Sequence, residues 1–416
     1  MSAAVPNGAG AEDAHAAKRY IEGTHRTHSP AQTLARLRPL LPTLGITRVA
    51  NLTGLDRTGV HTAMACRPNS RSVAMFQGKG LTLEAAKVSA IMEALEVWHA
   101  ERILNPLKWA SPREMARLHR VAELAALPRV SGIAIDPQAP LMWIEGTDLQ
   151  GAGAVWIPFE LVNMNYTLPL ATLGGTFQSN SSGLGCGNHR LEALSHGLCE
   201  AIERDARTLW EREAPARRAQ RMIDLVSVED PQCRALLFQL DAAGFSVHVW
   251  DATSDVGIAT FVAMLSDRED GQSEPELGSG CHPARHVALL RALTEAAQAR
   301  TTYITGARED FFPEHYEPQA RAQRRMATMR WASAPAALRE YAEAPDFRSD
   351  SIEDDVRRVL ALLRAAGMGE AIAVDLSQEA IGIPVVKIVV PGLEGATSYE
   401  DTGYFPGARA RRMAVR

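Results

Sequence analysis

The sequence contains no long apolar run. No stretch of the 416 residues approaches the roughly 20 consecutive apolar residues that a membrane-spanning helix needs. The N-terminal segment MSAAVPNGAGAEDAHAAKRY also lacks the apolar core of a signal peptide. We therefore expect a cytoplasmic protein that does not bind a membrane.

Cysteine is scarce and its positions lie far apart. The five thiols form no CxxC pair, so the sequence indicates neither a disulfide framework nor a structural zinc site. We expect them to be small buried hydrophobes. His189 and His196 lie near Cys186 and Cys199 but lack the HExxH spacing of zinc enzymes. We therefore assign these histidines to packing or supporting roles.

An excess of positive charge is also missing. The net charge is -5 and the pI is about 6.2, which argues against nucleic-acid binding. The composition, 46% hydrophobic and 22% charged, is that of an ordinary globular protein. Residues 1–28 carry no periodic apolar pattern and are predicted to form a mobile leader. Residues 29–404 would form one catalytic domain, and residues 405–416 a basic tail, solvated and mobile.

Hydrophobic periodicity predicts interleaved helices and strands. A 3.6-residue apolar repeat predicts helices over residues 29–41, 82–102, 190–213 and 284–303. Runs rich in β-branched residues predict strands over 141–144, 154–157, 246–250, 258–264 and 383–390. The charged segment 317–369 is predicted to form surface helices. These elements indicate an α/β fold, but their spacing is too irregular for a Rossmann or barrel repeat.

Acidic residues follow one face of the helix at 82–102. Ser89, Glu93 and Glu96 stand at i, i+4 and i+7, so they point the same way. Their neighbours, Ala85 and Ala100 among them, are small or apolar. Carboxylates on such a surface need neutralisation or a partner, because they repel one another and a low dielectric disfavours their charge.

The next two long helices repeat this pattern. Asn188 precedes the second helix, whose Glu192, Glu200 and Glu203 lie on one side, and the third helix offers Glu295 and Gln298. Hard oxygen ligands without thiolate or imidazole suit Mg²⁺, which often shares its shell with nucleotide phosphates. The alternative is three solvated helix faces.

Two cationic residues lie beside glycines. Lys79 in Gln77-Gly78-Lys79-Gly80 is predicted to lie on a flexible turn before a helix, a layout suited to phosphate. It is no P-loop, because GxxxxGK[ST] is absent, and a hairpin turn with a solvated lysine is the alternative. Arg308 lies two residues after Gly306 and could bind a phosphate bidentately. Its alternative is a surface salt bridge to Glu309 or Asp310.

The glycine-rich run 183–188 does not fit a dinucleotide site. Asn188 occupies the position where GxGxxG requires glycine, and the preceding TFQSNSS is too polar for a buried strand. We interpret the run as a loop whose backbone approaches a ligand and caps the second helix.

Three segments resemble the signatures of the YcaO family. They are GKGLTLEAAKVSAIMEALEVWHAE, SNSSGLGCGNHRLEALSHGLCEAIERDA and LLRALTEAAQARTTYITGARED, and PVVKIVVPGLE follows near the C-terminus. The resemblance covers residues 45–395. It implies a large α/β fold of β-sheets packed with helices and a non-P-loop ATP site lined by acidic helices.

The resemblance also implies roles for the residues that match the motifs. Lys79 and Arg308 would be catalytic and face phosphates. Mg²⁺ would be held by Glu93, Glu96, Glu192, Glu200, Glu203 and Glu295. ATP would be bound by Lys79, Ser89, Glu93, Asn188, Glu192, Glu295, Gln298 and Arg308.

Members of this family use ATP to phosphorylate a backbone amide oxygen after a nucleophile has added to the amide carbon. A neighbouring Cys, Ser or Thr gives an azoline, and external sulfide gives a thioamide. The end FPGARARRMAVR lacks the PxPxP pattern common in azoline-forming members, and GITRVANLTGLDRTGV and RPNSRSVAMFQGKG resemble members that work with a TfuA partner. We therefore favour thioamide formation, keep azoline formation as the alternative, and keep a non-catalytic ATP- or peptide-binding subunit as a third.

The expected partners are a peptide or protein substrate, a TfuA-type protein, a sulfide donor and a second copy in a homodimer. The short cationic end, without prolines to fix its backbone, is expected to lie outside the active site and to be dispensable for ATP turnover.

Overall fold

The computed structural model describes residues 16–130, 132–151, 153–169, 175–270, 273–332, 338–395 and 404–414. The chain divides into two compact units. Unit 1 comprises Met1–Lys18, Leu95–Arg212 and Ser349–Arg416, and unit 2 comprises Arg19–Ala94 and Glu213–Arg348. No helix among the described residues is long and apolar enough to cross a membrane.

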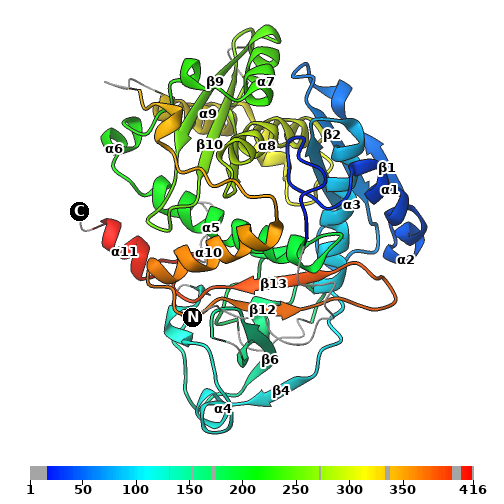
Figure 1. Cartoon of the computed structure of the whole chain (residues 1–416), viewed down its shortest axis with the longest axis vertical. Coiled ribbons are helices and arrows are strands. Elements are labelled where there is room, and N and C mark those ends of the chain that lie inside the picture. The colour runs from blue at the N-terminus through cyan, green and yellow to red at the C-terminus, as the bar shows by residue number, and fades with distance from the viewer. Residues whose placement is uncertain are drawn as a thin grey trace. The chain divides into compact units, whose positions relative to one another are not determined.

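Unit 2 contains two antiparallel sheets (Figure 1). The first has the order β1-β2-β3, with β1 at Arg48–Asn51, β2 at His61–Cys66 and β3 at Met75–Gly80. The second has the order β11-β10-β9, with β9 at Phe245–Asp251, β10 at Thr260–Asp267 and β11 at Glu276–Cys281. The helices are α1 (Pro30–Leu37), α2 (Leu41–Leu44), α6 (Pro215–Ala219), α7 (Pro231–Ala242), α8 (Arg285–Thr305) and α9 (Pro318–Ala332). Helices α7 and α8 pack on the second sheet around buried Leu240, Phe261 and Leu293.

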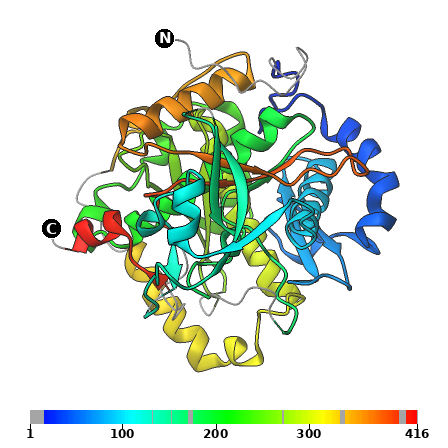
Figure 2. The same cartoon turned by 90° about the horizontal axis from the view of Figure 1, so that it is seen from below.

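Unit 1 is built on a six-stranded sheet. Its path is β4 (Leu107–Ala110), β6 (Leu141–Asp148), β12 (Ile372–Asp375), β13 (Val385–Val389) and β8 (Leu184–Cys186), with β7 (Ala154–Pro158) paired to β6. The short strands β5 (Arg129–Val130) and β14 (Tyr404–Phe405) pair separately. The helices are α4 (Pro112–Leu118), α5 (Arg190–Glu211), α10 (Ile352–Ala365) and α11 (Ala408–Ala414). Helix α5 packs on β8 and β13, with α10 beside it (Figure 1 and Figure 2).

Helix α3 (Leu83–Ala100) carries the first acidic stripe, and the division between the units falls inside it, after Ala94. It confirms the helix expected at 82–102, as α5 and α8 confirm those at 190–213 and 284–303. The five predicted strands correspond to β6, β7, β9, β10 and β13. The segment 317–369 contains the predicted surface helices: α9 has no buried residue among those described, and α10 buries one face (Ile352, Val356, Val359 and Leu363) and exposes the other.

Three Gly-x-Gly strands fix the small-residue faces of the long helices. A Cβ at Gly78 in β3 would lie 2.1 Å from the Ala90 amide nitrogen of α3, and one at Gly278 in β11 would lie 2.2 Å from the Ala296 nitrogen of α8. At Gly185 in β8 the nearest atom would be the Ala193 carbonyl oxygen of α5, at 2.6 Å. Only glycine permits such an approach of backbone to backbone.

This packing corrects two expectations. The GKG segment is not a flexible turn, because Gly78 to Gly80 complete strand β3. The run 183–188 is not entirely a loop, because residues 184–186 form β8. The N-cap of α5 is His189, whose Nδ1 accepts the Leu191 amide at 3.1 Å. The small residues on the long helices therefore serve strand packing.

Both predicted terminal segments make contacts. Residues 1–15 of the expected leader lie outside the described residues, but Lys18 forms an ion pair with Asp355 at 2.7 Å. At the other end, residues 408–414 form α11, and Arg409 pairs with buried Asp205 of α5 at 2.9 Å. The expectation of a solvated, mobile tail is therefore wrong for residues 408–414. Its dispensability for ATP turnover stays a prediction.

Candidate active site

In unit 2 the structure brings Lys79 and Glu295 together. The glycines on either side of Lys79 face α3, so its own side chain points to the other face of β3. There its Nζ lies 2.6 Å from Oε2 of Glu295 on α8. The second oxygen of Glu295 accepts the Ser279 amide at 3.2 Å and its hydroxyl at 3.3 Å. Both side chains of the pair stay partly exposed, at 21% and 25%, which leaves them accessible to a ligand.

Arg308 forms the salt bridge to Asp310 that was the alternative to a phosphate contact. Its Nε donates to Asp310 at 2.9 Å, and its Nη2 donates to the other oxygen of the same carboxylate. Burial disfavours the charged guanidinium, but the bonds to Asp310 and the charges of Glu93 and Glu309 outweigh it and raise the pKa of Arg308. A phosphate contact of Arg308 therefore stays a proposal. Ser89, Glu93 and Gln298 are half-buried in the same unit.

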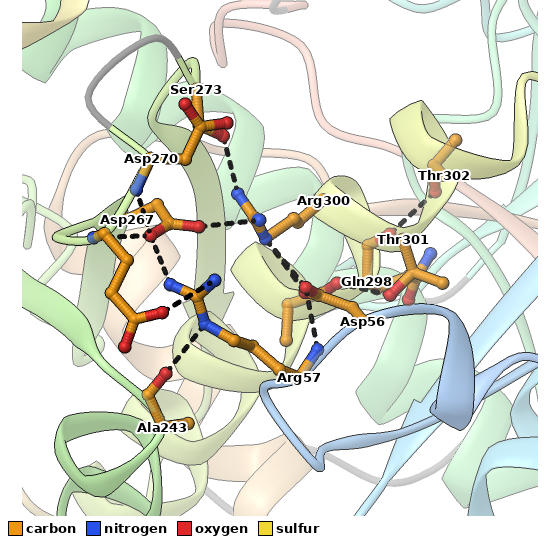
Figure 3. A network of polar contacts seen from close by, with 12 residues as sticks. Asp56, Arg57, Ala243, Asp267, Asp270, Ser273, Gln298, Arg300, Thr301 and Thr302 are labelled. Carbon is orange, nitrogen blue, oxygen red and sulfur yellow. Dashed lines mark hydrogen bonds and ion pairs between the residues drawn. The ribbon is translucent and has the colours of Figure 1, made fainter.

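An ionic network anchors α8, the helix that carries Glu295 and Gln298 (Figure 3). The Arg300 guanidinium bonds Asp56 at 2.9 Å and Asp267 at 3.1 Å, and its Nη1 donates to Ser273 at 2.9 Å. Asp56 follows the short helix at Thr53–Leu55, whereas Asp267 ends β10. One guanidinium thus ties three separate parts of unit 2 together.

A second arginine completes the network. Arg57 donates to Asp267 and to the Ala243 carbonyl, and the Arg57 and Arg300 guanidinium groups lie 5.0 and 4.9 Å from the Phe245 ring centroid. Burial opposes ionisation of Asp267, but two backbone amides and Arg57 outweigh it and hold its pKa below the usual range. No local sequence pattern predicts this network, because its members lie far apart along the chain.

In unit 1 three predicted ligands are buried. Glu96, Glu192 and Glu203 are 8%, 0% and 7% exposed. The Glu192 carboxylate accepts the Asn188 amide at 2.9 Å, so it also holds the start of α5. His196 Nε2 lies 4.0 Å from Oε1 of Glu96, which connects α5 to the end of α3.

The pKa of Glu200 on α5 is shifted by its surroundings. Burial raises its pKa; Arg204, at 3.3 Å, lowers it, and the charge of Glu203 raises it again. The net shift is upward, as expected for carboxylates crowded in a region of low dielectric. A divalent cation relieves this repulsion, and hard oxygen donors are the ligands that Mg²⁺ prefers. Glu200 and Glu203 therefore offer the kind of donors that suit the metal implied by the sequence, and the other predicted ligands stay a proposal.

The predicted residues thus form two sets. Unit 2 holds Lys79, Ser89, Glu93, Glu295, Gln298 and Arg308, and unit 1 holds Glu96, Asn188, Glu192, Glu200 and Glu203. Helix α3 contributes to both, because Glu93 and Glu96 lie about one turn apart on it.

Sequence reasoning missed Lys387. It lies on β13, is only 2% exposed, and its Nζ donates to the Asn180 carbonyl. Burial lowers its pKa to about 8, against the opposing effect of Glu200. The one signal available was a single charge inside the apolar run PVVKIVVPG, where a buried strand otherwise has none.

Comparison with known proteins gives the family. The model described as YcaO cyclodehydratase, ATP- and Mg²⁺-binding, matches residues 77–394. A protein from the tfuA 3' region of Rhizobium leguminosarum bv. trifolii is 36% identical over 377 residues, which cover 89% of this chain and 88% of that protein. Because the family model matches well over half of its residues, the chain belongs to the YcaO family.

Solved structures have the same fold. YcaO from Methanopyrus kandleri, bound with AMPPCP and Mg²⁺, gives a TM-score of 0.75 at 23% identity, over 94% of this chain and 98% of that one. A heterocyclase in complex with substrate and cofactor gives a TM-score of 0.72 at 22% identity. The match covers 92% of this chain but only 55% of the heterocyclase chain. The expected α/β fold is confirmed. The family is ATP- and Mg²⁺-binding, which confirms the two cofactors and supports an enzyme.

Proposed function

We propose that this protein uses ATP and Mg²⁺ to phosphorylate a peptide backbone amide oxygen and then replaces that oxygen with sulfide, which gives a thioamide. The observation that carries the proposal is the pair of acidic residues Glu200 and Glu203 on α5, where burial and the charge of Glu203 raise the pKa of Glu200, so that a divalent cation would stabilise both charges. The similarity to a protein of a tfuA region favours sulfide as the nucleophile and a TfuA-type protein as the partner.

In this proposal the acidic residues would bind the metal and the basic residues would bind the phosphates. Glu93, Glu96, Glu192, Glu200, Glu203 and Glu295 would hold Mg²⁺. Lys79 and Arg308 would face the phosphates, and each must leave or share its present carboxylate, Glu295 or Asp310, to do so. Ser89, Asn188 and Gln298 would add neutral hydrogen bonds to the nucleotide. Bound Mg²⁺-ATP would supply the phosphoryl group and neutralise the charge that develops on it.

Azoline formation on Cys, Ser or Thr is the second candidate. The matching family model is described as a cyclodehydratase, and a heterocyclase shares the fold. Against it stands the basic end of the chain, which lacks the PxPxP pattern. A homodimer also stays a prediction.

Reconstitution separates these reactions. The purified chain is incubated with ATP, Mg²⁺, sulfide, a TfuA-type partner and candidate peptides, and the peptides are examined by mass spectrometry. We expect the mass gain of sulfur replacing oxygen. Loss of one water from a peptide without sulfide uptake would establish azoline formation instead, and unchanged peptides in every mixture would favour a non-catalytic subunit.

Calorimetry tests the metal site without a peptide. We expect AMPPCP to bind wild-type protein with Mg²⁺ and to lose most of its affinity in excess EDTA or after Glu203→Gln. The matched control is Glu353→Gln, which changes an acidic residue of α10 paired with surface Arg357. Equal affinity in all these conditions would rule out a metal-bridged site.

A further inference from the structure

A cavity of about 50 Å³, partly open to solvent, lies in unit 1 between α5 and β13. Apolar side chains form much of its wall, among them Leu161, Ala201, Ile388 and Leu393. Ala201 and Arg204 line it from α5, where each directly follows a predicted metal ligand, Glu200 or Glu203. The cavity therefore shares its helix with the carboxylate set.

Two polar groups in this wall have hydrogen-bonding capacity to spare. Lys387 is almost fully buried, and its ammonium, which has three donors, donates one hydrogen bond among the described residues, to the Asn180 carbonyl. Gln178 presents a buried Oε1 that accepts no hydrogen bond from any described residue. Buried polar atoms are nearly always paired, so a donor from a ligand is the natural partner for this oxygen.

The pattern of donors and acceptors selects the ligand. A secondary amide offers an N–H for Gln178 and a carbonyl oxygen for Lys387, and its neighbouring carbon atoms suit the apolar wall. A carboxylate could pair with Lys387 or Arg204, but it has no donor for the Gln178 oxygen and would meet the charge of Glu394, which also lines the cavity. A cation would be repelled by Lys387 and Arg204. An uncharged peptide unit satisfies all of these groups.

We propose that this cavity binds a backbone amide of the peptide substrate, with Lys387 donating to its carbonyl oxygen and Gln178 accepting its N–H. The inference rests on the proposed function, because it assigns a substrate subsite to the same enzyme. Substrate held here would lie beside the helix whose carboxylates are assigned to Mg²⁺.

Methyl NMR of the full-length protein tests this directly. The probe is N-acetylglycine N-methylamide, an uncharged molecule with two peptide units, and the reporters are the methyl groups of Ala201, Ile388 and Leu393. We expect saturable shifts confined to the cavity methyls. Lys387→Met should weaken binding by about tenfold, the usual effect of one lost hydrogen bond to a charged donor. Ala201→Leu should fill the cavity and abolish binding.

Exposed Ala216 of α6 provides the matched control, and Ala216→Leu should bind the probe as wild type does. Should Lys387→Met fail to fold, Gln178→Ala tests the other hydrogen bond with the same expected loss. No saturable shift, equal binding by Ala201→Leu, or tighter binding of acetate to the same methyls would overturn the proposal. Calorimetry with AMPPCP and Mg²⁺ on the same samples separates the two ideas: nucleotide binding without amide binding refutes only this inference, whereas absent nucleotide binding refutes the proposed function.

Discussion

Replacing Arg300 with methionine should destabilise the protein strongly. Arg300 is 12% exposed and pairs with Asp56 and Asp267, whose side chains are 5% and 1% exposed. Arg300→Met keeps the aliphatic bulk but leaves Asp56 without its cation, whereas Asp267 keeps Arg57. Removing one partner of a buried pair costs about 3–5 kcal/mol. Because Asp267 keeps a partner, we expect a loss in the lower half of that range, together with about 0.5–1 kcal/mol from the contact with Phe245.

Urea unfolding followed by tryptophan fluorescence measures this loss, since buried Trp250 lies in the sheet of the same unit. The control is Arg357→Met, because the Arg357 side chain is 56% exposed, and an exposed ion pair contributes at most about 1 kcal/mol. Adding Asp56→Asn to Arg300→Met should recover stability, because it removes the stranded charge. Equal losses in the Arg300 and Arg357 variants, or no recovery in the double variant, would refute the assigned role of the network.

Three further predictions test other parts of the structure. Burial, and then the charge of Glu274, raise the pKa of Glu276 from 4.5 to about 8. Between these pH values the folded state holds a proton that the unfolded state releases, so the stability falls as the pH rises. Glu276→Gln should flatten this fall when the melting temperature is measured against pH. Gly78→Ala should cost at least about 1–3 kcal/mol in chemical denaturation, because its Cβ meets the α3 backbone, whereas Gly54→Ala, with open space around it, should change stability by no more than about 0.5 kcal/mol. Arg409→Met should destabilise unit 1 by about 1–3 kcal/mol, because Asp205, whose pKa burial already raises to about 6 beside Arg409, would lose that cation and have to take up a proton in the folded state; a melting temperature equal to that of wild type would restore the prediction of a solvated tail.

The sequence was informative where periodicity reflects packing. Helices α3, α5 and α8 and the β-branched strands were predicted because an apolar repeat marks the face that each element buries. Strands β3, β8 and β11 were not predicted. Their Gly-x-Gly segments contain few β-branched residues, because the helix backbones lie too close for any Cβ. A rule that assigns glycine-rich segments to turns therefore fails where glycine serves close packing.

Part of the candidate site could likewise be predicted from the sequence, and part of it could not. Helical spacing alone placed Glu93 and Glu96 on one face of α3, and the structure confirms one continuous helix there. The pairing of Lys79 with Glu295 joins residues more than two hundred positions apart, and no local pattern predicts such a contact. Lys387 was likewise missed, since its importance lies in the cavity and the helix beside it. Motif resemblance named the residues, and the fold determined which of them meet.

The origin of the oxygen in the released phosphate tests the proposed chemistry most directly. A substrate peptide found by reconstitution is prepared with a heavy oxygen isotope in the modified amide, and the inorganic phosphate formed from ATP is examined by mass spectrometry. Amide activation predicts that the heavy oxygen appears in phosphate as the peptide gains sulfur, in equal amounts. Phosphate free of the heavy isotope, together with a modified peptide, would contradict O-phosphorylation of the amide and with it the function proposed for this protein.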